Sequence, residues 1–341
     1  MLKDRGNNGE KVAEEIVPVK ADARTYATIS VPEANGSYRV EFLQREEEGL
    51  WPKGWVIADD QIDFSEPCIA AKDPSGKLEF TFDPATGELV SLKSGSLFKT
   101  ELLAEPLTLD IFRAPSQNEP NDGKRWFAIG ADNPVRKLVS FSDKEENAVR
   151  KVSSVVEYAV SGSVFTVASD WTIQNGAAKL KAKFKRTGKE FEPARVGLRT
   201  RLVKSALDVE WLGLGPWENY CDRKSGAFLG TWELPSKEFF FPYDVPQDCG
   251  NREGTYRVTV SSLFDSLTVE TLGRPFAFEI NPYTPETLVK YKHPAELPEN
   301  DGTFFGVYAK SRGLGGNSCG PLPLRKDCVL GTDFELELVI K

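Results

Sequence analysis

The feature that most constrains this 341-residue chain is an alternation of apolar and polar side chains that recurs along most of its length. Residues 78–82 read Leu-Glu-Phe-Thr-Phe, and residues 334–340 read Phe-Glu-Leu-Glu-Leu-Val-Ile. Successive side chains of a strand point to opposite faces, so this period of two predicts strands with one buried and one wet face. A chain built this way favours antiparallel sheets over helices.

The same alternation predicts further strands at 164–171, 180–184, 196–202, 256–260, 267–271 and 276–280. Residues 78–82 and 89–92 form a hairpin with the turn Asp83-Pro-Ala-Thr-Gly87 between them. A helical pattern is almost absent. The exception is a short helix expected at residues 285–290, with Thr284 as N-cap and Pro285 at its first position. The predicted fold class is all-β, with two packed antiparallel sheets.

The first 66 residues predict a smaller unit of three or four strands, at 11–17, 26–31 and 38–42. Turn signals at Asn8-Gly9 and Asn35-Gly36 are typical of a small β-sandwich. The stretch Ser65-Glu-Pro67 is the expected linker. We therefore predict two domains, residues 1–66 and 67–341.

Charge and composition exclude several classes of function. The net charge is -8 and no block of lysine or arginine occurs, so neither nucleic acid nor a membrane is an expected partner. Five cysteines without CxxC spacing indicate neither a disulfide framework nor a zinc site. With one histidine, His293, multi-histidine metal sites cannot form, and we expect no metal and no cofactor.

No apolar run reaches the length of a membrane span, and the first nine residues lack the apolar core of a signal peptide. We expect a cytoplasmic protein on this evidence. In a longer parent protein, the N-terminus and any signal would lie outside this sequence.

Residues 207–252 carry the densest set of chemically informative side chains. An alternating strand around Trp211 ends at Gly213, Gly215 and Pro216, and a loop of aromatic, amide and charged residues follows. One interpretation is ordinary turn chemistry with a solvated ion pair. The other is a site for polyhydroxylated ligands or a polar subunit contact. A dinucleotide site is excluded, because Glu218 occupies the place of the third glycine and no helical pattern follows.

A resemblance favours the second interpretation. The residues that carry it are Pro193-Ala-Arg-Val-Gly-Leu198, Pro242-Tyr243, Val245-Pro-Gln247, Gly250-Asn-Arg252 and Trp211-Leu-Gly-Leu-Gly-Pro-Trp-Glu-Asn-Tyr-Cys-Asp-Arg-Lys-Ser-Gly-Ala-Phe228. This set resembles the C-terminal, small-chain domain of the β-galactosidases of glycoside hydrolase family 2. The resemblance covers nearly the whole chain, since residues 51–64 are similar to the end of the immunoglobulin-like linker domain that precedes it.

The resemblance implies a large antiparallel β-supersandwich of the galactose mutarotase-like type, preceded by a truncated immunoglobulin-like β-sandwich with an exposed edge. It also implies that the two catalytic glutamates lie on a (β/α)8 barrel, which takes about 250 residues of alternating strand and helix. This chain contains no such segment. We therefore assign it no catalytic residue and expect no hydrolysis by the chain alone.

Two loops are expected to line the sugar pocket. Residues 112–122 resemble the family's Arg-Ala-Pro-x-Asp-Asn-Asp loop, with Asn118 and Glu119 in its amide-then-acid order and Gln117 in place of an acid. Residues 312–321 resemble a glycine-rich segment that enters the pocket. The residues predicted to bind substrate are Asn118, Glu119, Asn317, Ser318 and Cys319. Many relatives have tryptophan where Cys319 stands, so stacking on a sugar is not expected there.

Without the resemblance, each loop also fits a plain role, as a polar surface turn and as a glycine-rich turn with a cysteine. A structural or interface role is predicted for His293 and for the residues of the third loop, Trp217, Glu218, Asn219, Tyr220, Asp222 and Arg223.

Three functions follow. The first is a non-catalytic part or small subunit of a β-galactosidase-like retaining hydrolase, which completes a galactoside pocket with a barrel-bearing partner. The second is a free-standing carbohydrate-binding module that uses the loops of Trp217 and Cys319. The third is a purely structural role in assembly.

Overall fold

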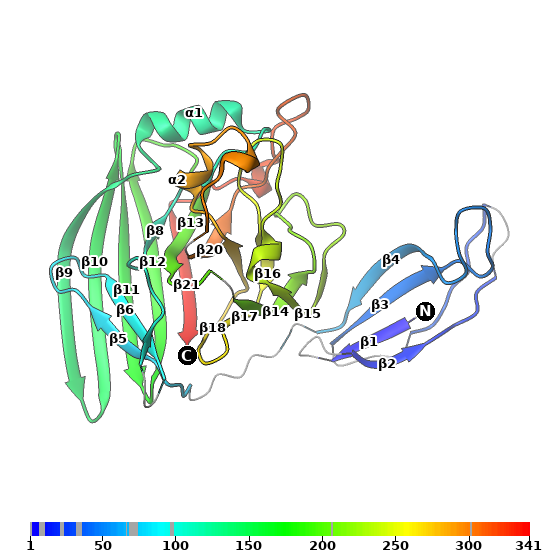
Figure 1. Ribbon diagram of the computed structural model, residues 1–341, viewed down its shortest axis with the longest axis horizontal. Coiled ribbons are helices and arrows are strands. Elements are labelled where there is room, and N and C mark those ends of the chain that lie inside the picture. The colour runs from blue at the N-terminus through cyan, green and yellow to red at the C-terminus, as the bar shows by residue number, and fades with distance from the viewer. Residues whose placement is uncertain are drawn as a thin grey trace.

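The computed structural model describes residues 2–6, 11–20, 24–31, 36–65, 67, 74–95, 99–205, 207–300 and 302–341. Within these residues, strands dominate and every strand pair is antiparallel, in four sheets. Figure 1 shows a small sheet at the N-terminus beside a much larger body. The prediction of an all-β, antiparallel fold is confirmed. Cys68 and the turn at Asn8-Gly9 lie outside the described residues.

The N-terminal sheet has the order β2-β1-β3-β4. Its strands are β1 (Leu2–Gly6), β2 (Lys11–Glu15), β3 (Gly36–Leu43) and β4 (Val56–Asp63). Tyr38 and Val40 of β3 are its buried apolar residues, and they pack against Val17, Ile29 and Val31. The strand expected at 26–31 is wrong: Ile29 and Val31 contribute side chains to this small core without joining the sheet.

β4 is an edge strand of this sheet, and it meets the larger body. The side-chain oxygen of Gln61 accepts a hydrogen bond of 2.7 Å from the backbone N–H of Leu229. The guanidinium of Arg39 lies 4.4 Å from the ring centre of Phe228. Leu229 belongs to β15 (Phe228–Pro235), an edge strand of the larger body. Its backbone N–H, which an open sheet edge would leave free for pairing with another strand, is therefore bound by the Gln61 side chain. The division at residues 66 and 67, and the immunoglobulin-like type of the first part, stay predictions.

The larger body contains a nine-stranded sheet of order β15-β14-β17-β18-β21-β12-β11-β10-β9. Its strands are β9 (Val135–Glu146), β10 (Val149–Val160), β11 (Ser163–Gln174), β12 (Ala177–Gly188), β14 (Asp208–Gly215), β15 (Phe228–Pro235), β17 (Arg257–Ser261), β18 (Ser266–Thr271) and β21 (Asp333–Ile340). The last strand of the chain, β21, therefore lies in the middle of the sheet, between β18 and β12.

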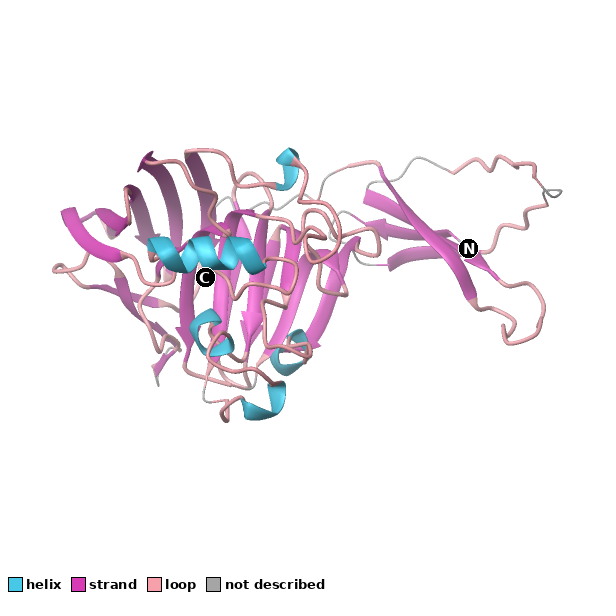
Figure 2. Cartoon of the chain, turned by 90° about the horizontal axis from the view of Figure 1, so that it is seen from above, coloured by secondary structure: helices cyan, strands magenta, loops and turns pink. Residues whose placement is uncertain are grey.

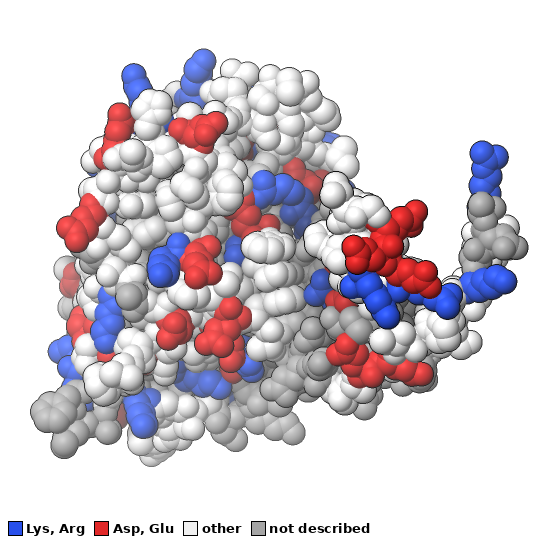
Figure 3. Space-filling model, turned by 45° about the vertical axis from the view of Figure 1, so that its right-hand side comes forward, with Lys and Arg blue, Asp and Glu red and all other residues white. Residues whose placement is uncertain are grey.

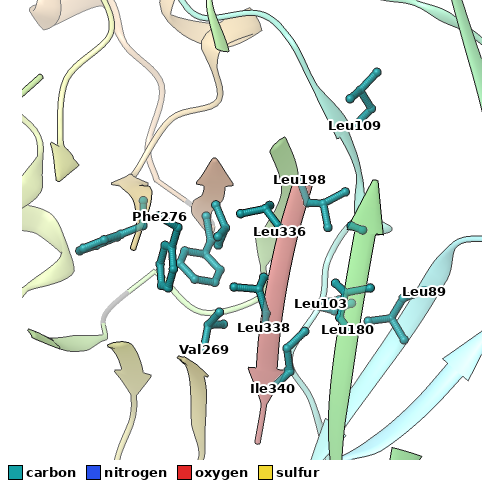
Figure 4. Close-up of a cluster of buried hydrophobic side chains, with 14 of the residues drawn as sticks. Leu89, Leu103, Leu109, Leu180, Leu198, Val269, Phe276, Leu336, Leu338 and Ile340 are labelled. Atoms are coloured by element: carbon teal, nitrogen blue, oxygen red, sulfur yellow. The ribbon is translucent and has the colours of Figure 1, made fainter. Parts of the chain in front are cut away.

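A five-stranded sheet of order β16-β19-β20-β13-β8 and a three-stranded sheet of order β5-β6-β7 complete the body. Their strands are β5 (Glu79–Phe82), β6 (Leu89–Ser94), β7 (Thr100–Glu101), β8 (Thr108–Asp110), β13 (Arg195–Leu202), β16 (Asn251–Thr255), β19 (Phe276–Asn281) and β20 (Thr303–Ser311). Figure 4 shows the core between the sheets, where Leu180 and Leu338 of the large sheet approach Leu198 and Leu89. Burial of this apolar surface is the main stabilising contribution.

In the part of the chain that the structure describes, the helices are α1 (Pro120–Ile129) and α2 (Pro285–Leu288), with 3-10 turns η1 (Ser236–Phe239), η2 (Pro294–Glu296) and η3 (Arg325–Asp327). α2 confirms the predicted short helix, and the Thr284 side chain accepts the hydrogen bond of the Thr287 N–H. α1 corrects the expectation of a loop over 112–122, because the helix begins at Pro120. Figures 1 and 2 place α1 across the ends of the strands.

The surface carries charges of both signs. Figure 3 shows acidic and basic side chains interspersed over the face that it draws. In the described part of the chain, no helix is long and apolar enough to cross a bilayer.

Candidate functional site

The two loops predicted to share a site lie in direct contact. The Asn118 side-chain amide donates a hydrogen bond of 2.8 Å to the carbonyl of Gly315. The Ser318 hydroxyl donates another of 2.8 Å to the side-chain oxygen of Asn118. The structure thus brings together residues that are 200 positions apart. Figure 1 shows the segment between β20 and β21 at the same end of the sheets as α1.

The remaining predicted residues of the glycine-rich loop lie on the same surface. Ser318 and Cys319 are exposed, and Asn317 is half-buried. The Ser318 hydroxyl lies 3.9 Å from the Cys319 sulfur. Asn118 and Ser318 keep lone pairs and one amide N–H beyond their mutual contacts, which are the groups that bind sugar hydroxyls. We refer to Asn118 and Ser318 as the polar pair; the thiol of Cys319 lies beside it.

Asp222 of the third loop fixes the backbone under Ser318. Its carboxylate accepts hydrogen bonds from the N–H of Leu314 at 3.0 Å and of Gly315 at 2.8 Å. Gly313 is required here, since a Cβ at that position would lie 2.5 Å from the Asp222 carboxylate. Gly315 has a φ of 63°, a conformation that glycine adopts without strain. The structure thus gives Asp222 a position in which its carboxylate holds the backbone of the glycine-rich loop.

Beneath the polar pair lies a buried ionic cluster, the arginine brace, formed by Arg113, Glu119, Asp122, Glu192 and Arg312. Arg312 donates to Glu192 at 2.9 Å, to Glu119 at 3.0 Å and to Asp122 at 2.9 Å. Arg113 donates to both oxygens of Glu119 and to the carbonyls of Arg312 and Gly313. The brace ties the start of α1 to the start of the glycine-rich loop.

Glu119 was predicted to bind substrate, and its position argues against direct contact. The side chain is fully buried, and its carboxylate accepts hydrogen bonds from Arg113, Arg312 and the N–H of Ser116. A carboxylate neutralised by two guanidinium groups has no remaining tendency to face solvent. In this chain Glu119 holds the loop that presents Asn118.

A second buried cluster continues from the brace into the five-stranded sheet. Arg195 lies among three carboxylates, at 2.9 Å from Asp110, at 3.1 Å from Asp248 and in contact with Glu279. The hydroxyl of Tyr308 donates to Asp110 at 3.1 Å. Burial raises the pKa of Glu279 well above its usual range, and it raises the pKa of Asp248 as well.

The third loop joins this second cluster. The hydroxyl of the buried Tyr220 donates to Asp248 at 2.9 Å. Asn219 is also buried; its side-chain amide donates to the carbonyl of Trp217 at 3.0 Å, and its side-chain oxygen accepts from the N–H of Glu253 at 2.8 Å. Both residues hold the loop in shape and are not available to a ligand.

The other predicted structural residues lie nearer the surface. The Glu218 carboxylate accepts hydrogen bonds from Arg223, from the Tyr243 hydroxyl and from the N–H of Gly250. Trp217 is 73% exposed. The exposed His293 begins the turn η2, and its backbone N–H donates to Glu296 at 3.2 Å. The structural or interface role of His293 stays a prediction.

The sequence did not single out Gln247, Arg113 or Arg312 as functional. The Gln247 side-chain oxygen accepts a hydrogen bond of 2.9 Å from the N–H of Gln117, beside Asn118. The arginines act over separations of about 200 residues, which no local pattern reveals. The available signal was an arginine near the start of each of the two loops, Arg113 before Ala114-Pro115 and Arg312 before Gly313.

The polar pair lies at the surface, with Asn118 half-buried and Ser318 exposed. A hollow of about 760 Å³ lies elsewhere, lined among others by Lys77, Phe264 and Lys341, and Asn118 and Ser318 do not line it. No group of three or more His, Cys, Asp or Glu side chains among residues that the structure describes is placed to hold a metal ion.

Comparison with known proteins places this chain in a family. The profile of the family described as "Beta galactosidase small chain" matches residues 74–340. A β-galactosidase of Lactococcus lactis subsp. lactis is 30% identical over 76% of this chain and 27% of that protein. A β-galactosidase of Actinobacillus pleuropneumoniae is 30% identical over 88% of this chain and 30% of that protein. The chain thus spans less than a third of the length of these relatives.

Among solved structures, a galactose mutarotase-like protein from Lactobacillus casei aligns with 79% of this chain and 98% of that protein, at 11% identity and a TM-score of 0.45. The family match covers most of the described residues of the larger body and both loops of the polar pair. The chain belongs to the β-galactosidase small-chain family.

Proposed function

We propose that this chain is a non-catalytic part of a β-galactosidase-like retaining glycoside hydrolase, in which it supplies one wall of the sugar pocket. The observation that carries the proposal is the contact between Asn118 and Ser318, which presents donors and acceptors from two distant loops on one exposed surface. Asn118 is half-buried and Ser318 is exposed, and their remaining donors and acceptors suit the hydroxyls of a galactoside.

The reacting acids would come from another segment. Retaining hydrolysis needs two carboxylates about 5 Å apart, of which one attacks and the other donates and accepts the proton. The carboxylates that follow Asn118 most closely, Glu119 and Asp122, are bound by Arg113 and Arg312. A barrel-bearing portion like the remaining seven-tenths of the relatives would supply the acids and complete the pocket.

In this role the chain contributes binding and orientation. Hydrogen bonds from Asn118 and Ser318 would hold the galactoside against the partner's acids, and such positioning lowers the barrier without proton transfer by this chain. Asp222 and the arginine brace keep the two loops in register, because each fixes backbone groups next to the polar pair.

The test is a chimera of the Lactococcus lactis relative whose matching segment is replaced by this chain, assayed with a chromogenic β-galactoside. We expect activity from the chimera, none from the relative without its segment, and none from this chain alone. An inactive chimera, with activity restored by the relative's own segment, would overturn the proposal.

A free-standing carbohydrate-binding module is the second candidate, and the exposed indole of Trp217 favours it, since an aromatic face can stack on a sugar ring. Calorimetric titration of the isolated chain with galactosides separates the two. Saturable binding that Trp217→Ala abolishes supports the module, whereas no heat of binding excludes it.

A further inference from the structure

We infer that an apolar rim formed by Phe241, Val245, Leu322 and Leu324 is the surface on which the catalytic portion docks. This inference rests on the proposed function and adds to it a partner surface on this chain. A sugar held by Asn118 and Ser318 can reach acids from another segment only when that segment approaches within a few ångströms. The residues around the polar pair must then lie in the contact.

One side of the rim is built into the glycine-rich loop. Leu322 is 60% exposed and Leu324 is 64% exposed, while Pro323 between them packs on Gly315, where a Cβ would meet the proline ring at 2.6 Å. The N–H of Gly316 donates to the carbonyl of Pro321 at 2.9 Å, and the N–H of Asp327 donates to the carbonyl of Leu324 at 2.8 Å. Both leucines are therefore held outward by an ordered backbone.

The other side of the rim is tied to the loop of Asn118. Val245 is 40% exposed, and two residues later Gln247 accepts the N–H of Gln117. Phe241 is 57% exposed and lies with its ring centre 4.6 Å from that of Tyr243, whose hydroxyl donates to Glu218. Each pair of exposed apolar side chains thus lies a few residues from a hydrogen bond to one of the two loops, Gln247 to Gln117 on one side and Gly316 to Pro321 on the other.

The chemistry of the rim fits an apolar protein surface. Exposed aromatic and aliphatic side chains beside a polar group supply apolar area whose burial contributes affinity in protein interfaces, while the polar groups contribute specificity. The relatives contain about seven-tenths of their length beyond the segment that this chain matches, which is enough chain to provide that surface. We assign the occupant to that portion rather than to a second copy of this chain.

The experiment mixes this chain with the Lactococcus lactis relative from which the matching segment has been deleted, and titrates restored activity to obtain a dissociation constant. The variant is Leu322→Glu combined with Leu324→Glu, and Leu322→Ala with Leu324→Ala is a milder second variant. The matched control is Leu263→Glu, because Leu263 is 86% exposed in the turn between β17 and β18. Circular dichroism confirms that all variants fold.

We expect the glutamate pair to raise the dissociation constant at least tenfold, the alanine pair to raise it severalfold, and Leu263→Glu to leave it within twofold. A glutamate pair that binds as tightly as the unchanged chain, or no more weakly than the control, overturns the inference. So does sedimentation that shows the glutamate pair dissociating a dimer of this chain without affecting the mixture.

The chimera keeps this test separate from the proposed function. Covalent linkage replaces association, so a chimera with the glutamate pair is expected to retain most of its activity. An inactive chimera with the unchanged chain contradicts the proposed function itself. An active chimera, together with a dissociation constant in the mixture that the glutamate pair does not change, contradicts only the docking surface.

Discussion

Asn118 and Ser318 depend on side chains that lie behind them. Asp222 holds two backbone N–H groups of the glycine-rich loop, and Arg113 holds two of its backbone carbonyls. Charge-assisted hydrogen bonds of this kind are stronger than neutral ones, so the loop is fixed from both sides. The positions of Asn118 and Ser318 are thereby set by Asp222 and by the buried Arg113.

Cysteine reactivity gives a residue-scale prediction. Burial raises the pKa of Cys221 to about 12 and that of Cys328 to about 11. At pH 8 the Cys221 side chain is therefore a thiolate in only about one of 10,000 molecules. Cys249 is buried, whereas Cys319 is exposed. We expect iodoacetamide at pH 8 to label Cys319 before these three, as measured by mass spectrometry of the peptides. Equal labelling of Cys221 and Cys319 would contradict the described loop.

At the scale of the element, α1 is a helix without an apolar stripe. Its buried residues are Asp122, Gly123 and Trp126, and Asp122 is buried because Arg312 binds it. The sequence therefore lacks the spacing of apolar residues by which amphipathic helices are predicted. Pro120 at the first position and Asp122 in the first turn were the available signals of a helix start.

The hairpin of β9 and β10 escaped prediction for a different reason. Its turn residues, Asn147 and Ala148, have positive φ angles of 53° and 60°, where Asn-Gly is the usual signal. β9 also contains an irregularity opposite Val155 and Val156, which breaks its alternation. The buried strands of the sheets, in contrast, were predictable because one of their faces packs against the core.

Gly123 gives an element-scale prediction. A Cβ at this position would lie 2.5 Å from the ring of Pro115, which precedes Asn118 in the same loop. Gly123→Ala should therefore destabilise the chain by roughly 1–3 kcal/mol through overpacking, although alanine is the better helix former. Urea unfolding measures the change. Gly226→Ala is the control, since no atom lies within 4 Å of its Cβ position, and equal stability of both variants would contradict the close packing of α1 on the loop.

At the scale of the whole molecule, charges are buried in a continuous layer behind the candidate site. Arg195 with its three carboxylates joins the five-stranded sheet to Asp248, and Tyr220 joins Asp248 to the third loop. The alternation of residues predicted the sheets, but it could not predict this layer. Asp110, Arg195 and Glu279 stand on three strands, and only the pairing of β8, β13, β19 and β20 brings them together.

Arg195 gives the prediction at this scale. Arg195→Leu leaves Asp110, Asp248 and Glu279 buried without their common cation, which should cost about 3–5 kcal/mol of unfolding free energy. Arg257→Leu is the control, because Arg257 pairs with Glu210 at 3.1 Å on the outer surface and should cost less than about 1 kcal/mol. Denaturant titration of both variants checks the difference; a similar small loss in both would mean that the cluster is not needed.

The central place of β21 in the nine-stranded sheet matters for the order in which the strands can pair. Every other strand of the nine-stranded sheet is synthesised before β21, yet β21 separates β18 from β12, so the sheet stays in two halves until residues 333–340 emerge. The glycine-rich loop, just upstream, arrives almost as late. Until β21 pairs with both neighbours, β12 and β18 each lack a partner on one side, so neither the nine-stranded sheet nor the core against it can be complete.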